Sequence, residues 1–111
     1  MKLLILILNK VEKTEEVLEG FLEIGITGAT VFNTVGMGHI LCEEVPIFAG
    51  LRFMFAGAKP HNRTIISAIE DEKEEPAINL LKKILGDMNK PGTGIVFTLP
   101  IDRVEGLMPE L

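Results

Sequence analysis

Residues 25–38 read GITGATVFNTVGMG, a β-branched run with two glycines on each side. The composition of Ala29 to Val35 predicts a strand. Glycine-spaced turns bind phosphate in many proteins, but a dinucleotide site needs a strand, then G-x-G-x-x-G, then a helix. Here Gly36 and Gly38 follow the strand and lead into no obvious helical pattern. The stretch therefore argues against a Rossmann site and for a glycine-bounded strand.

The chain before this strand predicts another strand and a helix. Leu3 to Leu8 is a continuous apolar run, which is typical of a strand. Thr14 is a candidate N-cap, and acidic residues follow it where the helix dipole favours anions. The apolar face expected for this helix consists of Val17, Leu18, Phe21 and Leu22. Gly25 is expected to end it.

The chain after the glycine-bounded strand predicts an irregular segment, roughly His39 to Asn62, and then a strand from Thr64 to Ile69. Pro76 suits the start of a helix, and Gly86 suits its end. The apolar positions at helical spacing are Ile78, Leu81, Ile84 and Leu85, with Lys82 and Lys83 in the last turn. A last strand is expected over Ile95 to Leu99.

This order predicts an α+β fold, a ferredoxin-like βαββαβ sandwich with a loop of about residues 39–62 inserted after the second strand. The whole chain, 1–111, is expected to form a single domain. Two helices cover only one face of a four-stranded sheet, yet LLILIL at residues 3–8 is apolar on both faces. A second copy of the chain is the simplest cover, which predicts a homo-oligomer. Shielding by the insertion is the alternative.

Charge and cysteine content restrict the class of protein. The net charge is −5, so the chain lacks the basic surface that nucleic-acid binding requires. Cys42 is the only cysteine, which excludes an internal disulfide and suits the reducing cytoplasm. The apolar run near the N-terminus is too short to span a bilayer and has no small-residue cleavage site after it. We therefore expect a cytoplasmic protein.

Three stretches together resemble the nitrogen regulatory protein P-II superfamily: MKLLILILNK at residues 1–10, GITGATVFNTVGMG at 25–38 and GTGIVFTLPIDRV at 92–104. The resemblance implies a ferredoxin-like homotrimer whose sheets face the centre. It also implies an effector, commonly an adenine nucleotide, in the cleft between neighbouring subunits. A long loop after the second strand would reach a target protein.

The resemblance implies a ligand-binding cleft with two walls. One wall would contain Thr30, Gly36, Gly38 and His39, and the other Gly92, Thr93 and Gly94. Arg103 and Lys90 are the charged residues best placed to assist. Glycines allow backbone N–H groups to approach a phosphate, but they are also ordinary turn residues, and both interpretations stay open.

The chain departs from the family at the charged positions of this cleft. His39 replaces the usual arginine, Ile40 the usual glutamine and Ile95 the usual lysine. Gly106 and Met108 align with arginines of the C-terminal segment. We therefore expect weak ATP binding and a less charged adenine derivative, or another small molecule, as effector. No cofactor is predicted.

The inserted segment offers two further sets of candidate residues. Metal-ligating residue types occur at His39, Cys42, Glu43, Glu44 and His61, but no pair has the spacing of a known metal motif, so no metal site is predicted. The chain has no tyrosine, which excludes uridylylation of the family's modifiable tyrosine. The second set is apolar around one cation: Phe48, Leu51, Arg52, Phe53 and Phe55. So much apolar surface predicts a partner-binding surface, or alternatively a part of the trimer core.

The sequence contains no arrangement of catalytic residues at a recognisable spacing, so an enzyme is not predicted. We expect a P-II-like signal-transduction protein that regulates a membrane transporter or an enzyme through its middle loop. One alternative is a structural oligomer without a ligand. The other is a small acylphosphatase-like enzyme, which would need an arginine in the loop after the first strand, where residues 9–13 read NKVEK.

Overall fold

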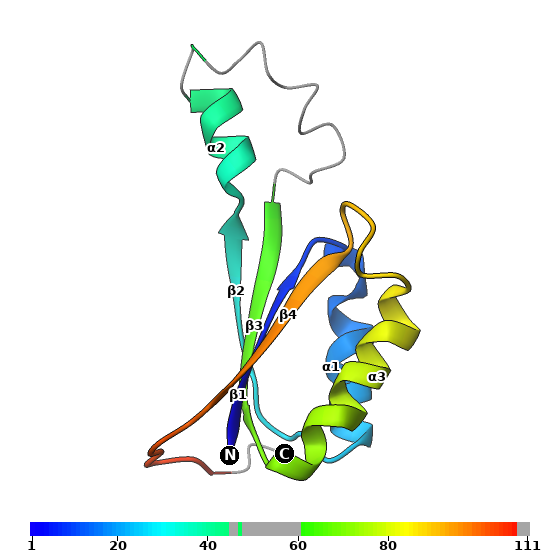
Figure 1. Cartoon of the computed structure of the whole chain (residues 1–111), viewed down its shortest axis with the longest axis vertical. Coiled ribbons are helices and arrows are strands. Elements are labelled where there is room, and N and C mark those ends of the chain that lie inside the picture. Colours follow the sequence, from blue (N-terminus) through cyan, green and yellow to red (C-terminus); the bar gives the residue numbers. More distant parts are fainter. Residues whose placement is uncertain (45–46, 48–60, 109–111) are drawn as a thin grey trace.

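The computed structural model describes residues 1–44, 47 and 61–108. Figure 1 shows the helices and strands of this part of the chain, with the strands forming one elongated sheet. In chain order they are β1 (Lys2–Leu8), the short 3-10 helix η1 (Val11–Lys13), α1 (Thr14–Glu23), β2 (Thr30–Val35), α2 (Met37–Glu44), β3 (His61–Ile69), the 3-10 helix η3 (Asp71–Lys73), α3 (Glu74–Leu85) and β4 (Gly94–Pro100).

The four strands form one sheet in the order β2-β3-β1-β4, and each neighbouring pair is antiparallel. β1 and β3 are the two central strands of the sheet, and β2 and β4 are its edge strands. Two β-α-β units interlock in this order, which is the ferredoxin-like arrangement. The predicted α+β fold is therefore confirmed.

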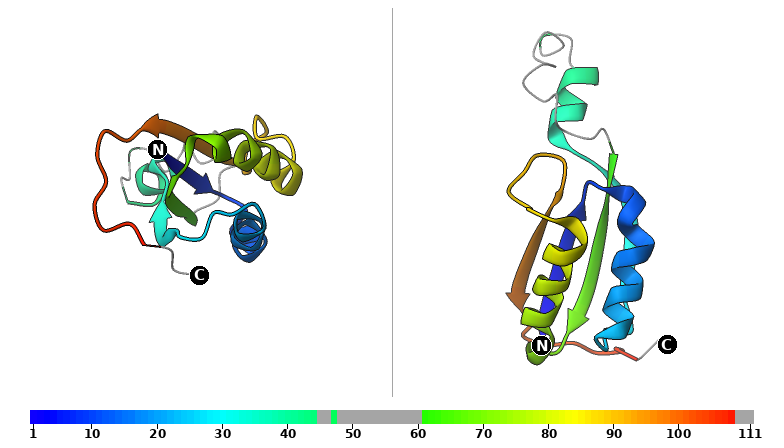
Figure 2. Two further views of the ribbon diagram at one scale, coloured as in Figure 1. Left: turned by 90° about the horizontal axis from the view of Figure 1, so that it is seen from below. Right: turned by 90° about the vertical axis from the view of Figure 1, so that its right-hand side faces the viewer.

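Helices α1 and α3 lie side by side on one face of the sheet (Figure 2). Between the helices and the sheet lies a core of buried apolar side chains: Leu4, Leu6, Leu8, Val17, Phe21, Ile26, Ile65, Ile69, Ala77, Leu81 and Leu85. Each large side chain buried in this way contributes about 1.5–3 kcal/mol relative to an exposed position. The core thus fixes the sheet against its two helices.

β1 is apolar on both of its faces, as the sequence predicted. Leu4, Leu6 and Leu8 point into the core and are fully buried. The alternate residues, Leu3 and Ile5 among them, point to the face without helices and are half-buried by neighbouring strands. A strand of this kind is typical of a sheet with both faces covered.

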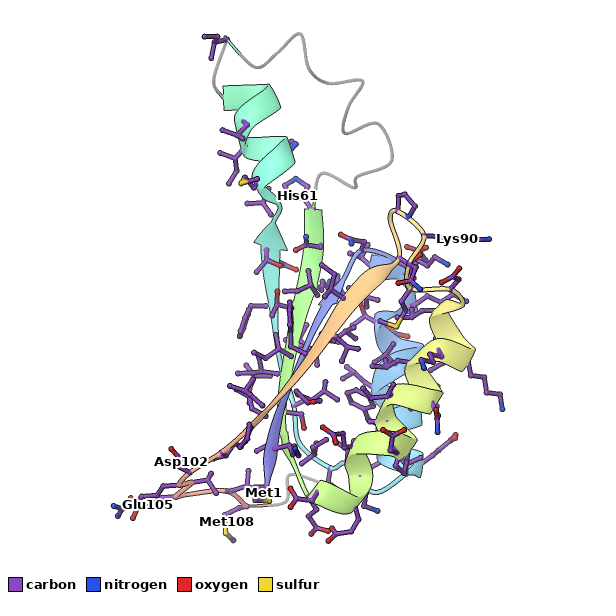
Figure 3. All side chains as sticks on the ribbon, in the orientation of Figure 1. Met1, His61, Lys90, Asp102, Glu105 and Met108 are labelled. Atoms are coloured by element: carbon purple, nitrogen blue, oxygen red, sulfur yellow. The ribbon has the colours of Figure 1, made fainter. Side chains whose placement is uncertain are left out.

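The face of the sheet away from α1 and α3 is apolar and open in the single chain. Strand register places nine apolar residues on it: Leu3, Ile5, Ile7, Phe32, Ile66, Ala68, Ile95, Phe97 and Leu99. Phe97 is 49% exposed and Ile95 is 52% exposed. We call these nine residues the open apolar face. Figure 3 shows side chains projecting on both sides of the sheet.

Helix α1 differs from the prediction at its N-terminus and in its apolar face. Thr14 is the first helical residue and not the N-cap, because η1 runs directly into α1 and the Thr14 hydroxyl donates to the Val11 carbonyl oxygen at 2.6 Å. Leu22 was expected on the apolar face but is 46% exposed, because the stripe formed by Val17 and Phe21 faces the sheet and Leu22 lies beside it. The predicted helix end before Gly25 is confirmed.

Helix α3 agrees more closely with its predicted pattern. It begins at Glu74, so Pro76 lies in the first turn, where its missing N–H group has no helical partner in any case. Leu81 and Leu85 are buried as expected, and Ala77 joins them. The helix ends at Leu85, before Gly86.

The predicted irregular segment from His39 is wrong in its first part. Helix α2 follows β2 directly, and its first described helical bond joins the Ile40 N–H to the Gly36 carbonyl oxygen at 3.2 Å. Gly38 makes this helix hard to predict from the sequence, because glycine in a helix costs about 1 kcal/mol relative to alanine. β3 likewise begins earlier than expected, at His61. Its polar first residues lack strand propensity but pair with β2, where His61 lies opposite Val35.

Candidate effector site

The first wall of the predicted cleft lies at the junction of β2 and α2. Gly36 follows the last residue of β2, and Gly38 and His39 lie in the first turn of α2. Backbone N–H groups in the first turn of a helix have no helical acceptor, so they are available to an acceptor on a ligand. An alanine Cβ at Gly36 would lie 3.9 Å from the Asn62 amide nitrogen, which is an ordinary contact. The fold of the single chain therefore does not require glycine at position 36.

The second wall precedes β4, where the glycines do have a structural reason. Gly92 has a φ of 77°, which L side chains rarely adopt. A Cβ at Gly94 would lie only 2.9 Å from the Ile7 carbonyl oxygen. Between them, buried Thr93 accepts hydrogen bonds at its carbonyl oxygen from the backbone N–H groups of Asn9, at 3.2 Å, and Lys10, at 3.4 Å. These contacts attach the loop to the end of β1.

The two walls lie on opposite edges of the sheet. Gly36 follows edge strand β2, and Gly94 begins edge strand β4, with β3 and β1 between them. Figure 1 shows α2 above one edge and the loop before β4 near the other. A single chain therefore does not bring the walls together.

A broad hollow of about 610 Å³ lies beside the second wall, at the end of α3. Its lining includes Gly94, Ile95 and Lys82. Pockets for small ligands commonly have volumes of about 300–1,000 Å³. The volume is within the range of nucleotide pockets, and Ile95, where the resemblance implied a lysine, is one of the lining residues.

Thr30 and Arg103 lie away from these walls. Thr30 starts β2 on the side of the open apolar face, opposite Ile66, at the end of the strand remote from Gly36. Arg103 follows β4 and forms an exposed ion pair with Glu105 at 2.6 Å. In Figure 3, Glu105 is at the opposite end of the molecule from His61 and Lys90. Within one chain, Arg103 and Lys90 do not converge on one ligand.

Sequence reasoning missed a group of polar residues at the start of β3. Asn62 lies between Thr34 and Asn9, bonded to the Thr34 hydroxyl and donating to the Asn9 side-chain oxygen at 3.4 Å. The Thr34 hydroxyl also lies 2.9 Å from that of Thr64. Arg63, on the helix side, lines a second hollow of about 280 Å³ with His61 and Asn33. The polar run HNR before an apolar strand was the available signal.

Lys10 lies in the loop after β1, the loop in which the acylphosphatase alternative would need an arginine. Its ammonium group donates to the Leu85 carbonyl oxygen at 2.9 Å, at the C-terminal end of α3. A cation there satisfies an otherwise unpaired carbonyl group and interacts favourably with the helix dipole. The structure thus gives Lys10 a helix-capping role.

The described part of the chain contains no cluster of three or more metal-ligating side chains. Residues 48–60, which include the predicted partner-binding set, lie outside the described residues. Phe48, Leu51, Arg52, Phe53 and Phe55 therefore stay a sequence-based prediction.

The strand topology and the glycine-bounded strand indicate a family relationship, and a comparison with known protein families identifies that family. The sequence model of the family "Nitrogen regulatory protein P-II" matches residues 1–110. The chain belongs to the P-II family. The matched range includes the segment between α2 and β3. No curated protein matched the chain in a direct sequence search.

Membership identifies a regulatory, signal-transducing protein of nitrogen metabolism. Among the described helices, none has the length and apolar character needed to cross a membrane. In the sheet, β4 lies at one edge beside β1, so the first and last strands of the described chain are neighbours.

Proposed function

We propose that this P-II protein is a homotrimeric sensor that binds a weakly charged adenine nucleotide between subunits and regulates a transporter or an enzyme through its middle loop. One observation carries the proposal. The two glycine-rich walls lie on opposite edges of the sheet, and the open apolar face extends between those edges.

The open apolar face supports association between copies. Phe32, Phe97 and Leu99 are each exposed by more than two fifths in the single chain, which is costly for large apolar side chains. Packing three sheets around an axis would bury this face without using the helices. In such a closed ring, the β2 edge of one chain adjoins the β4 edge of the next. Each boundary would then contain one wall from each chain.

The charge of the cleft determines the class of effector. His39 and Ile95 occupy positions where the family typically has arginine and lysine, and Ile95 lines the hollow beside Gly94. Each missing charge-assisted hydrogen bond removes about 1.5–3 kcal/mol of binding free energy. A triphosphate loses most from these replacements. We therefore propose AMP or a cyclic adenine nucleotide as the effector.

The output of the sensor would be the middle loop, residues 45–60, whose two ends follow α2 and precede β3. Its aromatic residues and Arg52 suit an apolar partner surface with a polar recess. An effector that binds one loop conformation better than another shifts the population between them. Because the lone cysteine suits a reducing compartment, we place this exchange in the cytoplasm.

Calorimetry with ATP, AMP and cyclic AMP tests the proposed effector class. AMP or cyclic AMP should bind more tightly than ATP, with one site per chain, and should raise the melting temperature by mass action. The matched variant is Gly36→Ala, which leaves the unliganded fold intact because the position has room. It should weaken nucleotide binding at least tenfold. Submicromolar ATP binding with no response to AMP or cyclic AMP would contradict the proposal.

A further inference from the structure

The two histidines of the chain lie side by side. His39 is in the first turn of α2, and His61 is the first residue of β3. Their ring centroids are 5.3 Å apart, and the ring planes are tilted by 55°. The chain contains no third histidine. Figure 3 shows His61 directly below α2.

The fold creates this pair from two distant parts of the sequence. Val35 and His61 are register partners at the end of the β2–β3 ribbon, and Gly36 connects β2 to α2. The first turn of α2 therefore stands above the start of β3. His39 is half-buried and His61 is exposed, so both rings remain accessible from solvent.

The spacing of the rings matches that of two imidazoles on one metal ion. A Zn–N bond is about 2.0–2.1 Å long, and a ring nitrogen lies roughly 1 Å from its centroid, so tetrahedral coordination places two centroids about 5 Å apart. The observed separation of 5.3 Å is close to this value.

We propose that His39 and His61 bind a divalent transition-metal ion of the zinc class. Imidazole nitrogen favours zinc, copper, nickel and iron, whereas magnesium and calcium favour oxygen ligands. The net charge of −5 attracts cations to the molecule. The dipole of α2 opposes a cation in its first turn, but this amounts to about a two- to fivefold effect.

Two ligands from the chain leave further coordination positions for water or other groups. The sequence alone did not predict this site, because His39 and His61 have no motif spacing. Their proximity is a consequence of the strand register.

The location gives the ion a structural consequence. It would join the start of α2 to the start of β3, the described elements on either side of the middle loop. Binding to the folded chain alone would also raise its stability by mass action. The proposal does not depend on the identity of the nucleotide effector.

A zinc titration of the full chain tests the proposal without any variant. With two histidines, the long-range ¹H–¹⁵N imidazole spectrum contains one set of signals for each ring. We expect both sets to shift together and saturate at one zinc ion per chain, with a micromolar dissociation constant. Magnesium should leave both sets unchanged. A spectrum in which only one ring responds, or neither, overturns the proposal.

Calorimetry with variants gives a second, independent readout. His39→Gln and His61→Gln should each weaken zinc binding at least tenfold, whereas the control Asp102→Asn, at the opposite end of the molecule, should bind as the wild type does. Circular dichroism confirms that each variant is folded. Unchanged zinc affinity in both histidine variants would overturn the proposal, because it would place the ion elsewhere.

Discussion

Gly94 lies so close to β1 that a Cβ on it would be 2.9 Å from the Ile7 carbonyl oxygen. The second glycine of the GTG stretch is therefore required by the packing of β4 against β1, whatever the cleft binds. Gly36 is different, because its nearest neighbour would be 3.9 Å from an added Cβ. The fold therefore requires glycine at position 94, whereas it has room for a side chain at position 36.

This difference predicts opposite results for two alanine substitutions. Gly94→Ala should lower the free energy of unfolding by about 1–3 kcal/mol, because the backbone of Ile7 must shift. Gly36→Ala should lower it by at most about 1 kcal/mol, since only a helix N-terminal preference is affected. Denaturant unfolding measures both. Equal losses in the two variants would show that the close approach to Ile7 has no energetic weight.

Lys10→Met should destabilise the fold by about 1–2 kcal/mol, because the Lys10 ammonium group donates to the last carbonyl of α3 at 2.9 Å. Lys83→Met is the matched control: Lys83 is exposed in the last turn of the same helix. Thermal unfolding compares the two. If both variants melt together, Lys10 does not cap the helix.

Ile95→Lys should restore part of an ATP site. Ile95 lines the hollow beside Gly94, and its side chain is 52% exposed in the single chain. Because Ile95 also belongs to the open apolar face, light scattering must show that the variant assembles as the wild type does. One charge-assisted hydrogen bond to a phosphate is worth about 1.5–3 kcal/mol, or roughly a 10- to 150-fold gain in ATP affinity. Calorimetry with ATP measures the gain. Ile95→Met is the apolar control, and an equal response in both variants would remove Ile95 from the cleft.

The middle loop is tested by capture of partners from detergent-solubilised membranes of the native host. Arg52→Ala and Phe53→Ala should each reduce capture of a specific partner, because aromatic and arginine residues dominate binding interfaces at about 2 kcal/mol or more each. Lys83→Ala, on α3, serves as the control. Unchanged capture together with a sharply lower melting temperature would assign these residues to packing within the protein.

Much of the fold was readable from local patterns. β1 is recognised by its continuous apolar run, and α1 and α3 by apolar residues at helical spacing. Both patterns arise from side-chain burial, so the sequence shows them directly. The doubly apolar β1 also predicted the open apolar face on the second side of the sheet. Thr14 was misplaced because the preceding 3-10 turn is set by backbone hydrogen bonds, for which the sequence has no clear signal.

The candidate site was less readable, because it depends on register. The starts of helix α2 and of β3 contain glycine or polar residues, which have weak intrinsic preference for helix or strand. Tertiary pairing therefore determines their secondary structure. The proximity of His39 and His61 follows from the Val35–His61 register and from no local motif. The separation of the two walls follows from the strand order, which places them on opposite edges.

Assembly through the open apolar face is the central claim, and light scattering tests it most directly. Phe97 is 49% exposed in the single chain, so an aspartate there is tolerated by one chain but would cost roughly several kcal/mol once buried between sheets. Leu22→Asp, on the helix side, is the matched control with a similar exposure. We predict three chains of 12.2 kDa per particle for the wild type and for Leu22→Asp, and a folded single chain for Phe97→Asp. A wild-type protein that stays a single chain at micromolar concentration would contradict the account and its intersubunit effector site.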